Sequence, residues 1–102
     1  MTLMARHEFV TWQAGVVDKD RYTPAMQAQI TADQVSQTSV SLSTAGALQH
    51  SEWVGLYAAP PEVPGGRAYV YRMVCTNRAV YEIMTIAPDG KIGGIRFTDH
   101  FG

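Results

Sequence analysis

The sequence predicts an α+β domain in which two to three N-terminal helices pack on a four-stranded antiparallel sheet. Up to residue 17 the apolar residues recur close to helical spacing, and after residue 48 they alternate in runs separated by Pro and Gly clusters. Helices that precede strands favour a sheet segregated from the helices. The chain has 102 residues, of which 46% are hydrophobic, so we expect residues 1–102 to form a single domain with one modest core.

Three helices are expected in the first half. Residues 3–17 carry apolar side chains near helical spacing, and Gly15 marks the exit. Residues 24–30 open with proline, which suits a first helical turn because the amide that it lacks would have no partner there. Residues 31–44 begin with the spacing of a capping box, which predicts a third helix. Within it, residues 40–43 alternate like a strand, so the end of this helix has two interpretations.

The second half predicts four strands, over residues 50–58, 67–75, 79–87 and 91–98. Three prolines and two glycines between residues 60 and 66 break regular pairing and make a long connection after the first strand. Pro88, Asp89 and Gly90 are typical of a three-residue hairpin loop, since proline sets the first turn angle and glycine supplies the left-handed residue. These residues therefore predict a hairpin between the last two strands.

Loop lengths predict how the strands align. If residues 76–78 form the second loop, Arg72 lies opposite Glu82. If residues 88–90 form the third loop, Glu82 also lies opposite Arg96. Opposite charges attract across a sheet, so we predict a charged row on one sheet face.

The two predicted sheet faces differ in composition. The face expected to meet the helices carries Tyr69, Tyr71, Met73, Cys75, Tyr81, Ile83, Thr85, Ile95 and Phe97, and Phe101 is a further candidate for it. The opposite face mixes the charged row with Val70, Val74, Val80, Met84, Ile86 and Ile92. Short helices cover one face only, so we expect a partner on the other. A second copy of the chain is the simplest partner, because two-fold dimers are the commonest oligomers.

Charge and cysteine content limit the partners and the cellular compartment that we expect. The formal net charge is −1 and no run of like charges occurs, which disfavours a nucleic-acid or anionic membrane partner. Cys75 is the single cysteine, so no intrachain disulfide and no thiolate metal cluster are expected. We therefore expect a reducing, cytoplasmic setting. The N-terminal segment lacks the apolar stretch of a signal peptide, and no metal or other cofactor is expected.

The helical half with four following strands, the segment Tyr69–Arg72 and the closing hairpin 88–97 together resemble the nuclear transport factor 2-like superfamily of cystatin-like folds. The chain is most similar to small domains that end in "DGKI.G..F", some of which precede serine-hydrolase-like domains. It is more weakly similar to bacterial proteins encoded in mobile gene cassettes. The resemblance implies that the sheet curves around the helices into a conical pocket, and that two copies pair through the outer sheet face.

Aromatic side chains dominate the expected pocket. The candidate ligand-binding residues are Trp12, Trp53, Tyr57, Tyr69, Tyr71, Met73, Tyr81 and Phe97. The candidate residues of the dimer face are Val70, Arg72, Val74, Glu82, Met84 and Arg96. A pocket of this kind takes a small apolar or aromatic ligand that phenol hydroxyls orient. Ordinary core packing is the alternative interpretation of the same aromatic residues.

Catalytic residues are not expected. Ketosteroid isomerases of the resembled superfamily need a carboxylate base in an apolar pocket, and the predicted register places no carboxylate on the inner face of the first three strands. The pairs His7 with Glu8 and His50 with Glu52 have too few ligands for a metal and are interpreted as surface residues. Three hypotheses follow: a non-catalytic, homodimeric ligand-binding domain, an accessory module without a ligand, and an isomerase-like enzyme. A carboxylate with a raised pKa in the cavity would favour the enzyme.

Overall fold

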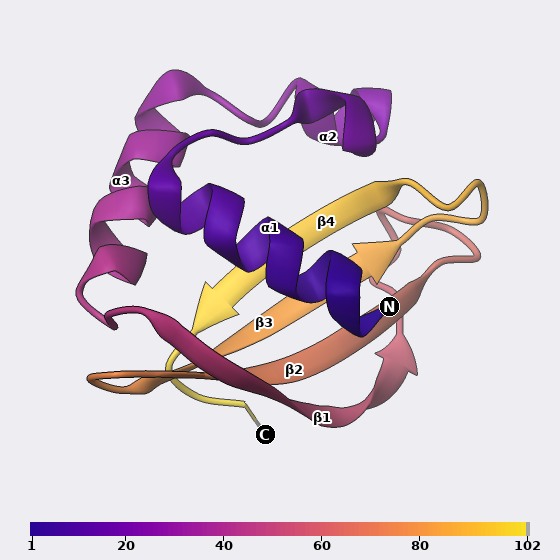
Figure 1. Cartoon of the computed structure of the whole chain (residues 1–102). Helices are drawn as coiled ribbons and strands as arrows, with labels where there is room; N and C mark the ends of the chain where they lie inside the picture. The colour runs from indigo at the N-terminus through magenta and orange to yellow at the C-terminus, as the bar shows by residue number, and fades with distance from the viewer. Residues whose placement is uncertain (102) are drawn as a thin grey trace.

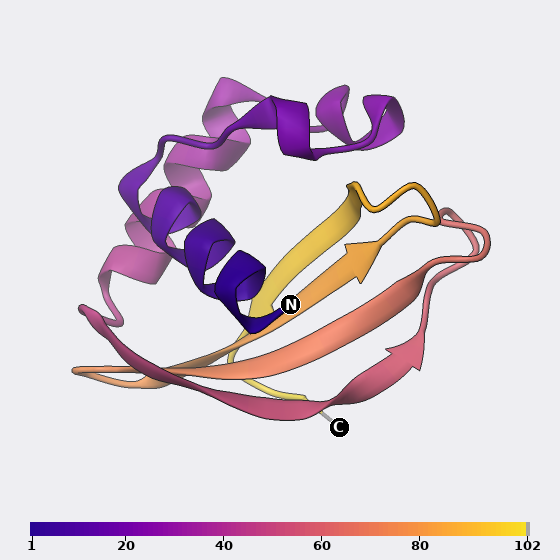
Figure 2. The same cartoon turned by 45° about the vertical axis from the view of Figure 1, so that its right-hand side comes forward.

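A computed structural model describes residues 1–101 and confirms the α+β class. The helices are α1 (Thr2–Ala14), α2 (Pro24–Gln27) and α3 (Ala32–Ser43), with a 3-10 turn at Lys19–Arg21. The strands are β1 (Leu48–Ala58), β2 (Arg67–Cys75), β3 (Ala79–Ile86) and β4 (Ile92–Thr98). They form one antiparallel sheet in the order β1-β2-β3-β4, and the helices lie on its concave side (Figures 1 and 2).

Local chemistry sets the ends of the helices. α1 is capped by Gly15, whose φ of 75° is left-handed. The helix therefore ends before residue 17, the predicted end. Thr23 and Thr31 cap α2 and α3, because each hydroxyl accepts a hydrogen bond from a backbone amide three residues later. Residues 40–43 are helical, so the strand interpretation of this segment was wrong.

The predicted register of β3 was wrong by one residue. Ala79 pairs with Val74 and not with Cys75, so Glu82 lies opposite Tyr71 and not Arg72. The hairpin over 88–90 is confirmed, since the amide of Ala87 donates to the carbonyl of Lys91 at 2.8 Å. An irregularity between Thr85 and Ile86 then shifts β4 by one residue, so Glu82 lies opposite Phe97. The predicted row of Arg72, Glu82 and Arg96 does not form.

These two shifts decide which side chains face the helices. A one-residue slip turns a whole strand over, so the even-numbered side chains of β3, including Val80 and Met84, enter the core. The predicted inner residues Tyr81, Ile83 and Thr85 are on the outer face, paired with the outer row of β2. On β4 the two shifts cancel, so Ile95 and Phe97 pack against the core as predicted.

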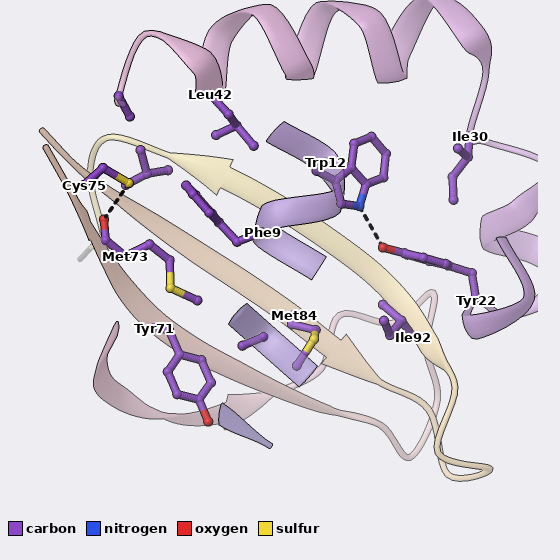
Figure 3. Close-up of a cluster of buried hydrophobic side chains, with 13 residues drawn as sticks. Phe9, Trp12, Tyr22, Ile30, Leu42, Tyr71, Met73, Cys75, Met84 and Ile92 are labelled. Atoms are coloured by element: carbon purple, nitrogen blue, oxygen red, sulfur yellow. Dashed lines mark hydrogen bonds between the residues drawn. The ribbon is translucent and has the colours of Figure 1, made fainter. Parts of the chain in front are cut away.

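The core fills the space between α1 and the sheet, as Figure 3 shows. The largest fully buried side chains of the protein are those of Tyr22, Phe9, Leu42, Met73, Met84, Ile92, Glu8, Glu82, Val70 and Val80. Of these, Val70 lies on the outer sheet face, where the loop over 59–66 and the C-terminal segment give partial cover. No helix within residues 1–101 is both long and apolar enough to span a membrane.

Candidate functional site

A groove of about 390 Å³ lies between the helices and the edge strand β4. The groove is lined by Trp12, Met26, Gln29, Gln34, Gln37, Thr38, Ser41, Leu42, Ile95, Arg96 and Phe97. Its residues come from α1, the segment at and after α2, α3 and β4. Its volume lies within the range of pockets that hold small molecules. It also occupies the region that the sequence predicts for a ligand, between the helices and the sheet, but at the β4 edge and not beneath α1.

Trp12 and Phe97 form the inner wall of this groove. Their rings tilt against one another at 6.1 Å between centroids, and Phe97 also meets Phe9 edge-on at 5.8 Å. The indole nitrogen of Trp12 donates to the Tyr22 hydroxyl at 2.7 Å, the contact drawn in Figure 3. This bond and the two ring contacts hold the indole in one orientation, which gives the groove a preformed aromatic wall.

The groove's outer rim carries glutamine side chains that make no hydrogen bond to the rest of the described chain, 1–101. Gln29 follows α2, whereas Gln34 and Gln37 lie on the first turns of α3. The structure shows no hydrogen bond from these three side-chain amides to another residue of the described chain, 1–101. Each amide therefore has a donor and an acceptor free for a bound molecule or for water.

Behind Trp12 lie two carboxyl groups that are fully buried. Glu8 on α1 and Glu82 on β3 are each 0% exposed. The Tyr22 hydroxyl donates to Oε1 of Glu8 at 2.5 Å. Oε2 of Glu8 and both carboxyl oxygens of Glu82 have no hydrogen-bond partner within residues 1–101. Buried polar groups without partners are rare in folded proteins, so this cluster needs a physical explanation.

Burial changes the ionisation of this cluster. Desolvation raises the pKa of the Glu82 carboxyl well above its ordinary value, and the nearby charge of Glu8 raises it further. Desolvation and the hydrogen bond to Glu8 likewise raise the pKa of the Tyr22 hydroxyl. The folded protein therefore keeps the Glu82 carboxyl neutral at a pH where an exposed glutamate is ionised.

Sequence reasoning missed this carboxyl cluster for two separate reasons. Glu82 was placed on the outer face because the register was one residue wrong. Glu8 was interpreted as a surface residue, yet it lies in the buried stripe of α1 with Ala5, Phe9 and Trp12. The spacing of these four residues is helical, so the stripe was a signal that could have placed Glu8 inside.

The eight predicted pocket residues separate into four groups, the last of which lies on the outer face of the sheet. Trp12 and Phe97 line the groove. Tyr71 and Met73 are solid core, as the alternative interpretation holds. Trp53, which is 54% exposed, lies with Tyr69 and Tyr71 in an aromatic cluster away from the groove.

Tyr57 and Tyr81 are on the outer face, which corrects their predicted place in the pocket. Each pairs with an outer residue of β2, and both rings meet Phe101, at 5.1 Å and 6.1 Å between centroids. Tyr57 was misplaced because the irregularity in β1 between Trp53 and Gly55 changes the side to which later residues point.

The predicted dimer face also needs correction. Val70, Arg72, Val74 and Arg96 belong to the outer face, whereas Glu82 and Met84 point inward and are fully buried. Arg72 pairs with Glu52 at 3.0 Å in place of Glu82, and Glu52 also meets His50 at 3.1 Å. These hydrogen bonds from His50 and Arg72 lower the pKa of the exposed Glu52 carboxyl.

A second groove, of about 580 Å³, runs over the outer face of the sheet. Val70 and Thr85 are among the buried residues of its floor, and Val63 and Phe101 form walls. Gly93 leaves room for Val63, since a Cβ atom there would come within 2.9 Å of the valine side chain. This outer groove is therefore shaped by the loop over 59–66 and by the C-terminal segment.

The described residues, 1–101, contain no group of three or more His, Cys, Asp or Glu side chains able to hold a metal ion. Comparison of the chain with protein-family models, with curated proteins and with solved structures finds no match. The resemblance to the nuclear transport factor 2-like superfamily therefore stays a prediction.

Proposed function

We propose that this protein is a non-catalytic binding domain that takes a small apolar or aromatic molecule into the groove between α2, α3 and β4. The observation that carries this proposal is the preformed wall of Trp12 and Phe97, held by a hydrogen bond at the back of the indole ring. An aromatic surface that is already oriented loses little conformational entropy when a ligand binds to it.

The lining of the groove defines the class of ligand. Met26, Leu42 and Ile95 extend the aromatic wall with apolar surface, which favours a ligand with a flat apolar body. The free amides of the rim would meet a hydrogen-bonding or anionic end of that ligand. Aromatic carboxylates and sulfonates combine these two properties.

Catalysis is not part of the proposal, because the buried carboxyl groups lie outside the groove. No carboxyl group lines the groove among the described residues, 1–101. Glu82 is an inward carboxyl with a raised pKa, as the isomerase-like hypothesis requires, but it is sealed within the core together with Glu8 and Tyr22. A general base must come within hydrogen-bond reach of the substrate proton, and this cluster lies outside the groove.

The experiment uses 8-anilinonaphthalene-1-sulfonate, an aromatic sulfonate, as the probe. The Trp53→Phe variant leaves Trp12 as the remaining tryptophan of the chain, so its emission reports on the groove. We expect saturable quenching of Trp12 by energy transfer to the bound probe. Replacing Trp53, which lies away from the groove, should leave the dissociation constant at its wild-type value.

A pair of substitutions on α3 locates the binding site. Thr38→Phe fills the groove and should weaken binding about tenfold or more, a loss of about 1.4 kcal/mol or more. Val40→Phe is the matched control, because Val40 is exposed on the same helix and does not line this groove. Equal affinity of the two variants for the probe would show that the groove is not the site.

A further inference from the structure

The buried carboxyl pair links α1 to the sheet at the point where the helix crosses β3. Glu8 comes from the buried stripe of the helix, and Glu82 rises from β3 between Val80 and Met84. Three of their four carboxyl oxygens have no partner within residues 1–101. A negative charge on Glu82 would be fully buried with no hydrogen-bond donor from residues 1–101, so the packing of α1 on β3 favours a neutral Glu82.

Among the described residues, 1–101, desolvation and the charge of Glu8 raise the pKa of Glu82, and no cation offsets them. Across the strands it faces Tyr71 on β2 and Phe97 on β4. From α1 it faces Glu8, and the Tyr22 hydroxyl next to Glu8 is already engaged as a donor. The ring nitrogen of His7 on α1 is 3.9 Å from Oε2 of Glu8, and the His7 side chain is half-exposed.

The same helix carries the wall of the proposed ligand site. Glu8 and Trp12 are four residues apart on α1, and both contact the hydroxyl of Tyr22. Any displacement of Glu8 from β3 therefore moves the indole that forms the groove wall. Protonation of one carboxyl and the shape of the groove depend on the same contact between helix and sheet.

We propose that Glu8 and Glu82 act as a proton-dependent latch for α1, so that loss of the Glu82 proton at rising pH loosens the helix and releases the ligand from the groove. The ligand part of this inference rests on the proposed function, whereas the latch itself does not. Linkage gives the direction of the effect, since proton binding to the folded state alone favours that state at low pH.

The sign follows from the raised pKa of Glu82. Below the ordinary pKa of glutamate, the folded and unfolded chains both hold the proton, and the full contribution to stability is present. Above that pH the unfolded chain releases the proton while the folded chain keeps it. The unfolding equilibrium constant then rises by up to about tenfold per pH unit, until the pKa of the folded state is passed.

The first test measures urea unfolding of the unliganded protein between pH 5 and 9. Wild-type protein should lose stability as the pH rises, and Glu82→Gln, which keeps the shape but cannot ionise, should lose the part of that slope due to one proton. Glu62→Gln is the matched control, because Glu62 is exposed in the loop over 59–66 and should leave the slope unchanged. Equal slopes for wild type and Glu82→Gln would overturn the latch.

A second measurement does not depend on the folding of a variant. Carboxyl-carbon NMR of the wild-type protein follows each of its four glutamates during a pH titration. A glutamate signal should titrate well above the ordinary range if Glu82 holds its proton in the folded state. The absence of any glutamate signal that titrates above that range would overturn the proposal.

Probe binding separates the latch from the proposed function. In the Trp53→Phe background the affinity for anilinonaphthalene sulfonate should fall as the pH rises, and Glu82→Gln should remove this dependence. The sulfonate stays ionised throughout, so the probe itself does not titrate. If stability falls with pH as predicted but the affinity for the probe does not change with pH, the latch stands and its coupling to the ligand groove is overturned. If the probe does not bind at pH 5, the proposed function alone is overturned.

Discussion

At the scale of single residues, two glycines show how backbone conformation and close packing contribute separately to stability. Gly46, after α3, and Gly90, in the hairpin before β4, both have φ of 87°, a left-handed value that disfavours other residues. They differ in their surroundings. A Cβ atom on Gly46 would come within 1.9 Å of Oγ1 of Thr76, whereas one on Gly90 would meet nothing within 4 Å.

We predict that Gly46→Ala destabilises the protein more than Gly90→Ala. The left-handed conformation alone costs alanine about 1–2 kcal/mol at either position. At Gly46 the added methyl also displaces Thr76, whose hydroxyl accepts a hydrogen bond from the amide of Ala47, and this should add about 1–3 kcal/mol. Urea unfolding of the two variants gives the comparison, and equal losses would contradict the packing argument.

At the scale of elements, polar contacts fasten α3 to its neighbours, because Leu42 is its one fully buried side chain within the described chain. The side-chain amide of Gln13 donates to the backbone carbonyls of Leu42 and Gly46, at 2.9 and 2.8 Å. The backbone carbonyl of Gln13 accepts a hydrogen bond from the Ser39 hydroxyl at 2.7 Å. The position of α3, and therefore the outer wall of the groove, depends on hydrogen bonds more than on apolar burial.

Arg78, in the loop between β2 and β3, also holds the end of α3 by hydrogen bonds. Its guanidinium donates to the carbonyl of Ser41, to the hydroxyl of Thr44 and to the carboxylate of Asp99. We predict that Arg78→Ala destabilises the protein by about 1–3 kcal/mol, since three contacts between separate elements are lost together.

Thermal unfolding in low salt measures this loss. Arg72→Ala provides the control, because Arg72 makes its one ion pair with the exposed Glu52 and joins only adjacent strands. Its removal should change stability little. A loss at Arg78 no larger than that at Arg72 would show that the α3 contacts contribute nothing to stability.

At the scale of the whole molecule, the outer face of the sheet carries apolar surface that the helices do not cover. Ile83 and Tyr57 line the open groove there, and Tyr57 is 46% exposed. Glu82 and Met84 are not part of this face, and the carboxylate that pairs with Arg72 there is that of Glu52. Dimerisation through this face, which the resemblance implies, stays a prediction.

We propose that two copies pair through this outer face, and sedimentation equilibrium at micromolar concentration measures the result. The wild-type protein is expected to sediment as a dimer. Ile83→Glu should give a monomer, because it places a charge in an apolar interface. Val40→Glu is the control, since Val40 is exposed on α3 on the opposite side of the sheet. A monomeric wild-type protein would contradict the prediction.

The sequence by itself determined the elements whose limits depend on neighbouring residues. Gly15, the threonine caps of α2 and α3, and the hairpin over 88–90 act within a few residues of chain, so their effects could be predicted locally. The inner row of β2 was also predicted correctly, because its aromatic residues alternate with smaller or charged ones.

Only the tertiary structure decided the orientation of β3 and the composition of the site. Both rows of β3 contain apolar residues, so alternation could not choose between them. Ala79 pairs with Val74 in place of Cys75, and this shift of one residue exchanges the inner and outer rows of β3. This orientation of β3 buries Glu82 next to Glu8. The groove likewise joins Trp12, Thr38 and Phe97, which are far apart in the chain and meet only when α3 and the edge of the sheet pack around α1. Local chemistry acts over a few residues, whereas register and pockets depend on contacts between distant segments.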